Sequence, residues 1–385
     1  MTTTPTQVLL DAEVDPDDLH KAAAAANRVA ASGAQVVELT PSGDDTLLVG
    51  AADDQHTITV AVAGKVAGVG SVVLPARRLL ATVGELRRSG TVRVAATPDE
   101  LTLRRGSLAA TIPRASVELP WLQGERGPEA TVHAGDLAGC LAQVAPFRSE
   151  LNDPGSATSG LRLQLVEGRL RATAVDASRM ATRSLPASSL LPDADGQTAA
   201  ECVLPGPAVE RIAGLAAGSP SDSRIEVRFG SKTVRAAGDV WTLTTRLLDA
   251  PWPRTEEVLG FVEGHPSRVR LRRMPLRLAA AVAVQTLTGR QTVPAHLTFG
   301  SAAVAIEMET EAGAVSETVD LELLAGEPAG RMGFSPRLLA TALDTVGSAA
   351  VELRLGEPNE PVLLTPHREV GDDDDLQVVI APMTL

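Results

Sequence analysis

The chain contains one sequence pattern three times at a constant spacing. Its anchors are Leu74, Leu204 and Phe334, which lie 130 residues apart. Each anchor is followed within two residues by a proline, then by a short amphipathic segment, and then by alternating apolar and polar residues. A fixed internal period is the mark of a structural unit that is repeated along the chain. The 385 residues therefore divide into three similar units.

Each unit is expected to combine two helices with a larger number of strands. The proline after each anchor suits a first helical turn, and the alternation that follows it is typical of half-buried strands. A second helical pattern precedes each anchor. The six expected helices cover residues 16–31, 75–89, 134–148, 206–218, 270–287 and 336–347.

This pattern predicts an α+β fold of three repeated domains, each with two helices packed on antiparallel sheets. The expected domains are 1–128, 129–255 and 256–385. The segment GERGPEA (124–130) is the expected first linker, and the second boundary falls within DAPWPRTEE (249–257).

Charge is unevenly distributed along the sequence. The net charge is −13, and the six expected helices carry +7, so the remaining residues carry −20. Overall negative charge argues against binding to phosphates, but segregated charge leaves one basic face available. Aromatic residues are rare at 2%, so stacking on single-stranded bases is not expected. The prediction is sequence-neutral contact with duplex phosphates, with solvation of an exposed surface as the alternative for any single arginine.

No catalytic or metal-binding motif is present. The segment GSKT (230–233) lacks the glycine-rich loop that a phosphate-binding motif requires. The six histidines are scattered, and Cys140 and Cys202 form no zinc spacing. The run Asp372–Asp375 offers oxygen ligands for a hard cation, although a solvated loop is the simpler interpretation. We therefore expect a protein that is not an enzyme and needs no cofactor.

The chain is also expected to be cytoplasmic, in the region of the nucleoid. Its first residues, MTTTPTQVLLDAEVD, have no basic start followed by an apolar run, as a signal peptide would. No stretch of 18 uninterrupted apolar residues occurs, so no membrane span is expected.

Several motifs, in order along the three units, resemble those of the bacterial DNA sliding clamp, the beta subunit of DNA polymerase III. The segments are TAVDASRMA (173–181), TTRLLDAPWPR (244–254), FSPRLLATALDTV (334–346), GEPNEPVLLTP (356–366) and VVIAPMTL (378–385). The resemblance covers essentially the whole chain. It implies a head-to-tail homodimeric ring that encircles double-stranded DNA, with helices lining the hole.

The resemblance also implies a processivity factor with many partners. The replicative polymerase, the clamp loader and repair proteins would dock short hydrophobic peptides into a pocket between the second and third domains. The implied pocket residues are Val175, Ala177, Ser178, Arg179, Met180, Pro253, Glu257, Val258, Ser335, Leu338, Asn359, Pro361, Val379, Ile380, Ala381, Pro382 and Met383.

The expected DNA contacts come from basic residues of the helical segments. They are Lys21, Arg28, Arg77, Arg78, Arg88, Arg148, Arg211, Arg273 and Arg277.

Four positions depart from the pattern of the family. Ser178 replaces a common histidine or tyrosine, Ala381 a methionine, Thr384 an arginine, and Glu257 a basic or neutral polar residue. Three interpretations stay open: an ordinary clamp, a specialised paralogue whose altered pocket confers tolerance to clamp-binding peptide antibiotics, and a ring scaffold that does not bind DNA.

Overall fold

The computed structural model describes residues 8–87, 90–150, 155–192, 196, 198–287, 293–327, 330–367 and 375–383. The predictions made for Arg88, Thr384 and Asp372–Asp374 concern residues outside these ranges. The chain forms two compact units. The first contains Met1–Gly135, Ser188–Thr198 and Gly214–Leu247, and the second contains Asp136–Ala187, Ala199–Ala213 and Leu248–Leu385.

The elements follow the same order three times along the chain. Each repeat begins with a strand and a helix, continues with a group of strands and a second helix, and ends with three strands. The expected pairing of two helices with antiparallel strands in each repeat is confirmed. The two units divide the middle repeat between them, so the three domain borders stay a prediction.

The first repeat comprises β1 (Leu10–Val14), α1 (Pro16–Ala30), β2 (Val36–Ser42), β3 (Thr46–Ala52), β4 (His56–Gly68), β5 (Val72–Pro75), α2 (Ala76–Glu85), β6 (Val92–Ala96), β7 (Glu100–Arg105) and β8 (Leu108–Pro113).

The second repeat comprises β9 (Glu129–His133), α3 (Ala134–Val144), β10 (Leu161–Val166), β11 (Arg169–Val175), β12 (Arg179–Pro186), β13 (Ser189–Leu191), β14 (Ala200–Leu204), α4 (Gly206–Ala217), β15 (Arg224–Phe229), β16 (Thr233–Ala237) and β17 (Trp241–Arg246). Two short 3₁₀ turns, Ala145–Phe147 and Ala157–Ser159, lie between α3 and β10.

The third repeat is preceded by α5 (Thr255–Glu263). It comprises β18 (Ser267–Arg272), α6 (Arg273–Gln285), β19 (Ala295–Phe299), β20 (Ala303–Thr310), β21 (Gly313–Ala325), β22 (Gly330–Phe334), α7 (Pro336–Thr345), β23 (Ala350–Leu355), β24 (Val362–Pro366) and β25 (Gln377–Ile380).

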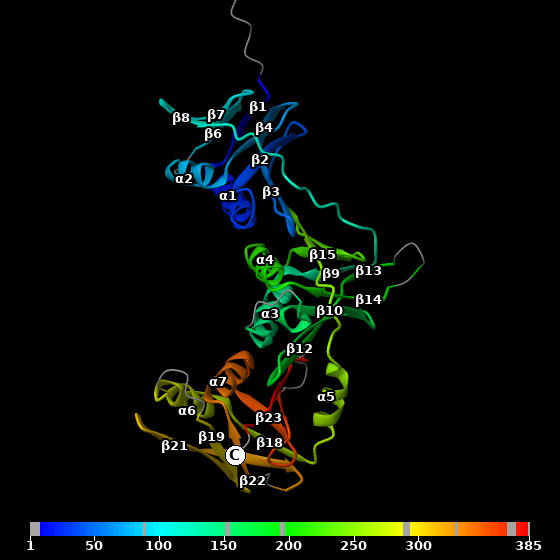
Figure 1. Ribbon diagram of the computed structural model, residues 1–385, viewed down its shortest axis with the longest axis vertical. Helices are drawn as coiled ribbons and strands as arrows, with labels where there is room; N and C mark the ends of the chain where they lie inside the picture. Colours follow the sequence, from blue (N-terminus) through cyan, green and yellow to red (C-terminus); the bar gives the residue numbers. More distant parts are fainter. Residues whose placement is uncertain are drawn as a thin grey trace, which may run out of the picture. The chain divides into compact units, whose positions relative to one another are not determined.

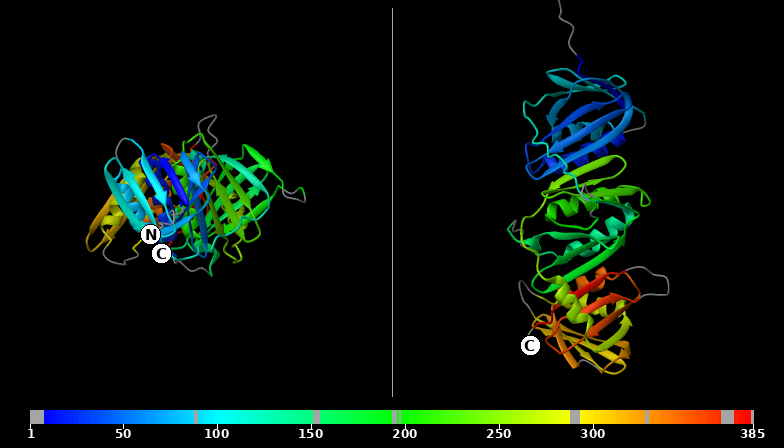
Figure 2. Two further views of the ribbon diagram at one scale, coloured as in Figure 1. Left: turned by 90° about the horizontal axis from the view of Figure 1, so that it is seen from above. Right: turned by 90° about the vertical axis from the view of Figure 1, so that its right-hand side faces the viewer.

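Each unit contains one large antiparallel sheet that joins strands of two repeats (Figures 1 and 2). In the first unit, β17 of the second repeat pairs with β4 of the first, with Leu243 opposite Ile58. In the second unit, β25 of the third repeat pairs with β12 of the second, with Met180 opposite Val379. In both cases the last strand of one repeat extends the sheet of the repeat before it.

The helices bury one apolar face against these sheets and against each other. In α1 the buried positions include Leu19, Ala22, Ala26 and Val29, which recur at helical spacing. The side chain of Asp15 accepts hydrogen bonds from the backbone of Asp17 and Asp18 at the N-terminus, the position at which a carboxylate satisfies unpaired amides. Figure 1 shows α1 and α2 side by side in the first unit.

Two sequence expectations about the helices are wrong in detail. The segment 270–287 was expected to be one helix, but Arg270 and Arg272 belong to β18, and α6 begins only at Arg273. Arg148 was placed in a helix but lies just past a 3₁₀ turn. Strand pairing to β21 and β23 outweighs helical propensity in the first of these segments. The helices proper therefore carry less positive charge than the sequence suggested.

The helix α5 was not expected from the sequence, where its residues were assigned to a boundary. Glu256 and Glu257 occupy its first turn, where negative charge is favourable. This acidic start was a usable signal, but the neighbouring prolines at 251 and 253 obscured it.

None of the helices among the described residues is long and apolar enough to cross a membrane.

Candidate nucleic-acid interface and peptide pocket

The described residues among the predicted DNA contacts fall into two structural classes, those that are exposed and form no ion pair within the described chain, and those held by other groups of the protein. Arg273 is of the second class: its Nε donates to the carbonyl oxygen of Ser348 at 2.7 Å and its Nη1 to that of Leu343 at 3.0 Å. The carbonyl of Leu343 is in the last turn of α7, where carbonyls have no partner within the helix. Ser348 lies in the segment between α7 and β23. The geometry indicates a structural role for this guanidinium.

Arg277 and Arg148 also hold partners of their own. Arg277 donates to both carboxylate oxygens of Asp344, at 2.6 and 3.3 Å. This hydrogen bond and the charge of Asp344 raise the pKa of Arg277. Arg148 is largely buried, and it binds the carbonyl of Ala145 and the carboxylate of Glu210.

Lys21, Arg28 and Arg211 occupy helical positions in α1 and α4. Lys21 is exposed and pairs with Asp18 at 3.0 Å within its own helix. Arg28 is exposed and Arg211 is half-buried, and each has a further interaction within the protein.

Arg77 and Arg78 are exposed in the first turn of α2. Neither forms an ion pair with any residue in the described part of the chain. Arg337 occupies the matching position of α7 and is also exposed, but it is not among the residues predicted from the sequence. The 130-residue period pointed to it, because Arg337 lies two periods after Arg77. These three side chains are therefore exposed cations in the first turns of matching helices.

The predicted peptide pocket centres on the turn between β11 and β12. Asp176 organises this turn: its Oδ1 accepts from the backbone of Ser178 and Arg179, and its Oδ2 accepts from the Arg179 side chain at 2.8 Å. Ala381 donates its backbone N–H to the carbonyl of Ser178 at 2.8 Å, which brings the segment after β25 onto this turn.

The apolar part of the predicted pocket is closed by its own side chains. Met180 and Val379 form one buried cluster with Val262 of α5 and Leu363 of β24, and Val175 packs against it. Ile380 is buried as well. The structure therefore brings these predicted residues together, but as a packed core beneath the surface.

Other predicted pocket residues surround this cluster at the surface. Pro382 and Met383 are half-buried, and the N–H of Met383 donates to the carbonyl of Gly333 at 2.7 Å, next to Ser335. Pro361 leads into β24, and its carbonyl is bonded by His265 at 2.9 Å.

The remaining residues of the predicted peptide pocket differ mainly in how exposed their side chains are. Leu338 and Ser335 are half-buried, whereas Ala177, Pro253, Glu257, Val258 and Asn359 are exposed. Glu257 pairs with Arg254 at 3.2 Å.

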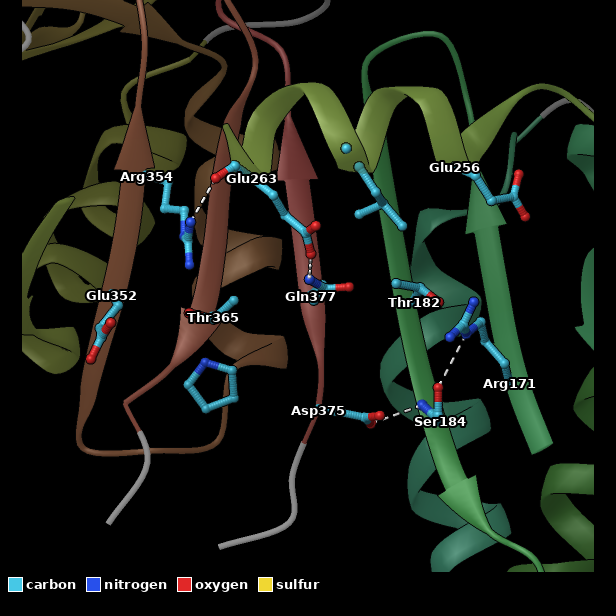
Figure 3. Close-up of a pocket in the computed structure, with 13 residues that line it drawn as sticks. Arg171, Thr182, Ser184, Glu256, Glu263, Glu352, Arg354, Thr365, Asp375 and Gln377 are labelled. Atoms are coloured by element: carbon cyan, nitrogen blue, oxygen red, sulfur yellow. Dashed lines mark hydrogen bonds between the residues drawn. The ribbon is translucent and has the colours of Figure 1, made fainter. Parts of the chain in front are cut away.

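A separate polar cavity of about 620 Å³ lies between α5 and the sheet of the second unit (Figure 3). None of the predicted pocket residues lines it. Its walls include Arg171, Ser184, Glu263, Arg354, Asp375 and Gln377.

Hydrogen bonds connect the walls of this cavity. Arg354 donates to the backbone carbonyl of Glu263 at 2.6 Å. The side-chain amide of Gln377 donates to the carboxylate of Glu263, also at 2.6 Å. Asp375, the one described member of the acidic run, accepts from the backbone of Ser184 at 2.9 Å and from Arg169 at 3.1 Å. Its carboxylate therefore accepts hydrogen bonds from other groups of the protein.

Among the described residues, no group of three or more His, Cys, Asp or Glu side chains is arranged to hold a metal ion. Cys140 and Cys202 are both buried and unbonded to each other, and burial raises the pKa of the Cys202 thiol.

Comparison with known proteins identifies a consistent set of relatives. The beta sliding clamp of Pseudomonas aeruginosa is 24% identical over 325 residues, which is 82% of this chain and 82% of the relative. The beta sliding clamp of Pseudomonas putida is 24% identical over 326 residues, with the same coverage of both chains. No protein-family model matches the chain.

Solved structures of sliding clamps share the fold over nearly the whole chain. A sliding clamp (DNA polymerase III subunit beta) from Pseudomonas aeruginosa bound to griselimycin superposes with a TM-score of 0.86 at 21% identity, covering 98% of this chain and 100% of the other. The DNA polymerase III beta subunit of Thermotoga maritima gives 0.83 at 16% identity, with the same coverage. The predicted sliding-clamp fold is confirmed.

The two classes of arginine are expected to differ in their effect on stability. Replacing Arg273 with alanine removes two charge-assisted hydrogen bonds to partly buried carbonyls and should lower the free energy of unfolding by about 2 kcal/mol. Replacing the exposed Arg77 with alanine should change it by less than about 0.5 kcal/mol. Urea unfolding followed by circular dichroism measures both values, and equal values for the two variants would contradict the assignment.

Proposed function

We propose that this chain, which resembles bacterial beta sliding clamps in sequence and shares their fold, is a DNA polymerase processivity factor. Two copies close into a ring around duplex DNA and slide along it without sequence preference. The protein acts by tethering a polymerase and carries out no catalysis itself. The observation that carries this proposal is the way in which the repeats join through their sheet edges.

The joints inside the chain define a donor edge and an acceptor edge. The donor is the last strand of a repeat, β17 or β25. The acceptor is the third strand between the two helices of the preceding repeat, which is β4 in the first repeat and β12 in the second. Both joints have the same antiparallel arrangement, because the repeats are built alike.

One donor edge and one acceptor edge remain without a partner among the described strands. The donor is β8, which pairs only with β7 and lies at the end of its sheet. The acceptor is residues 313–320 of β21, which pair with β20 on one side only. An open edge with unpaired backbone groups is a template for another strand. Pairing β8 with β21 of a second copy would repeat the internal joint and place Ala110 opposite Val315.

The helix beside the acceptor edge supports the same joint. On α6, Met274, Leu278 and Val282 form an apolar stripe with exposed fractions of 53%, 58% and 46%. In the second repeat, α3 holds Gln143 at the position that corresponds to Val282. The Gln143 side chain donates to the carbonyl of Thr345 on α7 of the next repeat at 3.1 Å. The exposed stripe of α6 therefore lies where the helix of a further repeat belongs.

Two such joints between two copies produce a closed ring of six repeats. Closed symmetry satisfies every edge and avoids an open filament. A ring that is linked topologically to DNA needs only weak phosphate contacts, for which the exposed Arg77, Arg78 and Arg337 are suited. Weak contacts also leave the ring free to slide.

The peptide pocket is proposed at the turn between β11 and β12. The griselimycin-bound clamp from Pseudomonas aeruginosa supports a ligand site somewhere on this fold. In the present chain the site would use the half-buried Ala381, Pro382 and Met383 around the packed Met180–Val379 cluster. Short hydrophobic peptides of polymerases, the clamp loader and repair proteins are the proposed ligands.

Ring closure predicts that a charge on α6 separates the two copies. Leu278→Asp places a carboxylate in the proposed apolar contact, so the variant should be monomeric where the unchanged protein is a dimer. Because Leu278 is 58% exposed, the fold itself should be retained. The control is Val69→Asp, which adds the same charge at a side chain that is 96% exposed and lies away from both edges.

Sedimentation equilibrium at micromolar concentration distinguishes the outcomes. An unchanged chain that sediments as a monomer, or a Leu278→Asp variant that stays dimeric, would count against the joint.

DNA encirclement predicts an effect of charge reversal at α2 and α7. The double variant Arg77→Glu/Arg337→Glu should leave nicked circular DNA several-fold faster after loading, because repulsion from phosphates replaces attraction. The control Lys65→Glu/Arg104→Glu makes the same change of charge at two exposed side chains of β4 and β7. Retention is measured by gel filtration of loaded circles, and equal retention of all three proteins would refute a role for these arginines.

The altered pocket predicts weak binding of partner peptides and of cyclic mimics. Ala381 offers less apolar contact than a methionine, which costs a ligand that uses it about 1–3 kcal/mol, and Glu257 repels acidic ligands. Ala381→Met and Glu257→Arg should each tighten binding of a polymerase-derived peptide in calorimetry. Tight binding by the unchanged protein, with no gain in either variant, would indicate an ordinary clamp and remove the case for a specialised paralogue.

A further inference from the structure

Each of the two linkers between repeats contains the dipeptide Pro-Trp. Pro120-Trp121 follows the first repeat, and Pro251-Trp252 follows the second, 131 residues later. The first linker lies between β8 and β9, and the second between β17 and α5. The chain contains three tryptophans, and two of them occupy these equivalent linker positions.

Trp121 lies on the sheet of the repeat that precedes it. Its ring covers Gly50 so closely that a methyl group at Gly50 would overlap ring carbon Cη2. The neighbouring Leu122 N–H donates to the hydroxyl of Thr57 at 2.9 Å, which fixes the linker against β4. The absence of a side chain at Gly50 is therefore what admits the indole.

The position that Trp121 covers is a row of three residues across β2, β3 and β4. Glu38 is opposite Gly50, and Gly50 is opposite Thr59. We call such a row the indole seat of its repeat. These three residues line a shallow hollow together with Trp121.

The second repeat has the same row with its own tryptophan. Arg162 is opposite Thr173, and Thr173 is opposite Thr182. The guanidinium of Arg162 lies over the ring of Trp252, 6.0 Å from its centre, within the range of a cation–π interaction. Trp252 Nε1 also donates to the hydroxyl of Thr255 at 3.2 Å, at the start of α5.

The third repeat has the row but no tryptophan over it among the described residues. His296 is opposite Glu307, and Glu307 is opposite Ser316. These three residues line an open pocket of about 480 Å³, which is in the range of pockets that hold a ligand. Its other walls include Pro294, Glu309 and Arg331.

The chemistry of this pocket suits an indole. Burial and the charge of Arg331 lower the pKa of His296 and outweigh the charge of Glu307, which raises it, so the neutral imidazole is favoured. The Nδ1 atom of His296 is buried without a hydrogen-bond partner in the described part of the chain. A neutral imidazole offers a flat face to an aromatic ring, and the carboxylate of Glu307 is an acceptor for an indole N–H.

We propose that the indole seat of the third repeat, formed by His296, Glu307 and Ser316, binds an extended Pro-Trp segment of a partner protein. The second linker is the template for this arrangement, because Thr173 fills the position of Gly50 there and Trp252 instead lies beside Arg162. Arg162 corresponds to His296 in the third repeat. The site is separate from the peptide pocket at the turn between β11 and β12, since the two share no residue. It does not depend on the role of the protein in replication.

Ring closure leaves this site accessible. In the first repeat, β17 pairs with the edge of β4 while Trp121 covers the sheet face at Gly50 of the neighbouring β3, because an edge and a face are different surfaces. Pairing of β21 with a second copy would likewise leave the face at Ser316 uncovered.

The test uses the full-length protein and a synthetic peptide of residues 117–125, VELPWLQGE, which carries the Pro-Trp dipeptide. A second peptide has alanine in place of the tryptophan. Calorimetry at up to millimolar peptide should show binding of the first peptide and at least tenfold weaker binding of the second.

Two variants then locate the binding. Ser316→Trp fills the seat from within, and His296→Ala removes the flat partner of the indole; each should weaken binding at least tenfold. Ala381→Glu, in the proposed peptide pocket, is the matched control and should leave the affinity unchanged. Circular dichroism and the unchanged oligomeric state verify that each variant is folded.

Two results would overturn the proposal. The first is no binding of the tryptophan peptide to the unchanged protein at millimolar concentration. The second is binding that persists in both seat variants or is lost in Ala381→Glu, because the peptide would then occupy another site.

Discussion

Backbone pairing at sheet edges is the interaction on which the rest of this structure depends. A strand at an edge exposes unpaired amides and carbonyls, which must be paired, covered or solvated. Here the last strand of one repeat completes the sheet of the previous repeat, as at Leu243 opposite Ile58 and at Met180 opposite Val379. The same rule applied once more leaves β8 and β21 to pair between copies, so the proposed ring follows from the local pairing rule.

The joints also determine where ligand sites arise. At the turn between β11 and β12, Asp176 and Arg179 hold the backbone that meets the segment after β25. The apolar side chains there are used for the joint itself, with Met180 only 2% exposed. A peptide ligand would therefore contact the rim around this core. The free row at His296 differs, because there no segment of the described chain covers the sheet face.

The basic side chains of the helices divide in the same way, into those bound by other groups of the protein and those free to meet a ligand. Arg273 and Arg277 are held by carbonyls and a carboxylate of α7 and its flanking turn, whereas Arg77 and Arg337 extend from the first turns of their helices. Sequence counting treated these side chains alike, because it records the charge of a residue and not its partner. The uneven charge of the chain thus overstated the number of cations available to DNA.

The sequence by itself determined the threefold repeat, the α+β class and most helices, because the period and the apolar spacing are local properties of the chain. It also predicted which segments surround the turn at Asp176, through the resemblance of their motifs. Tertiary structure alone decided that Arg270 lies in a strand, that Arg273 supports α7, and that Met180 is buried. These outcomes depend on contacts between residues far apart in the chain, and a side chain's partner and exposure are set only when those segments meet.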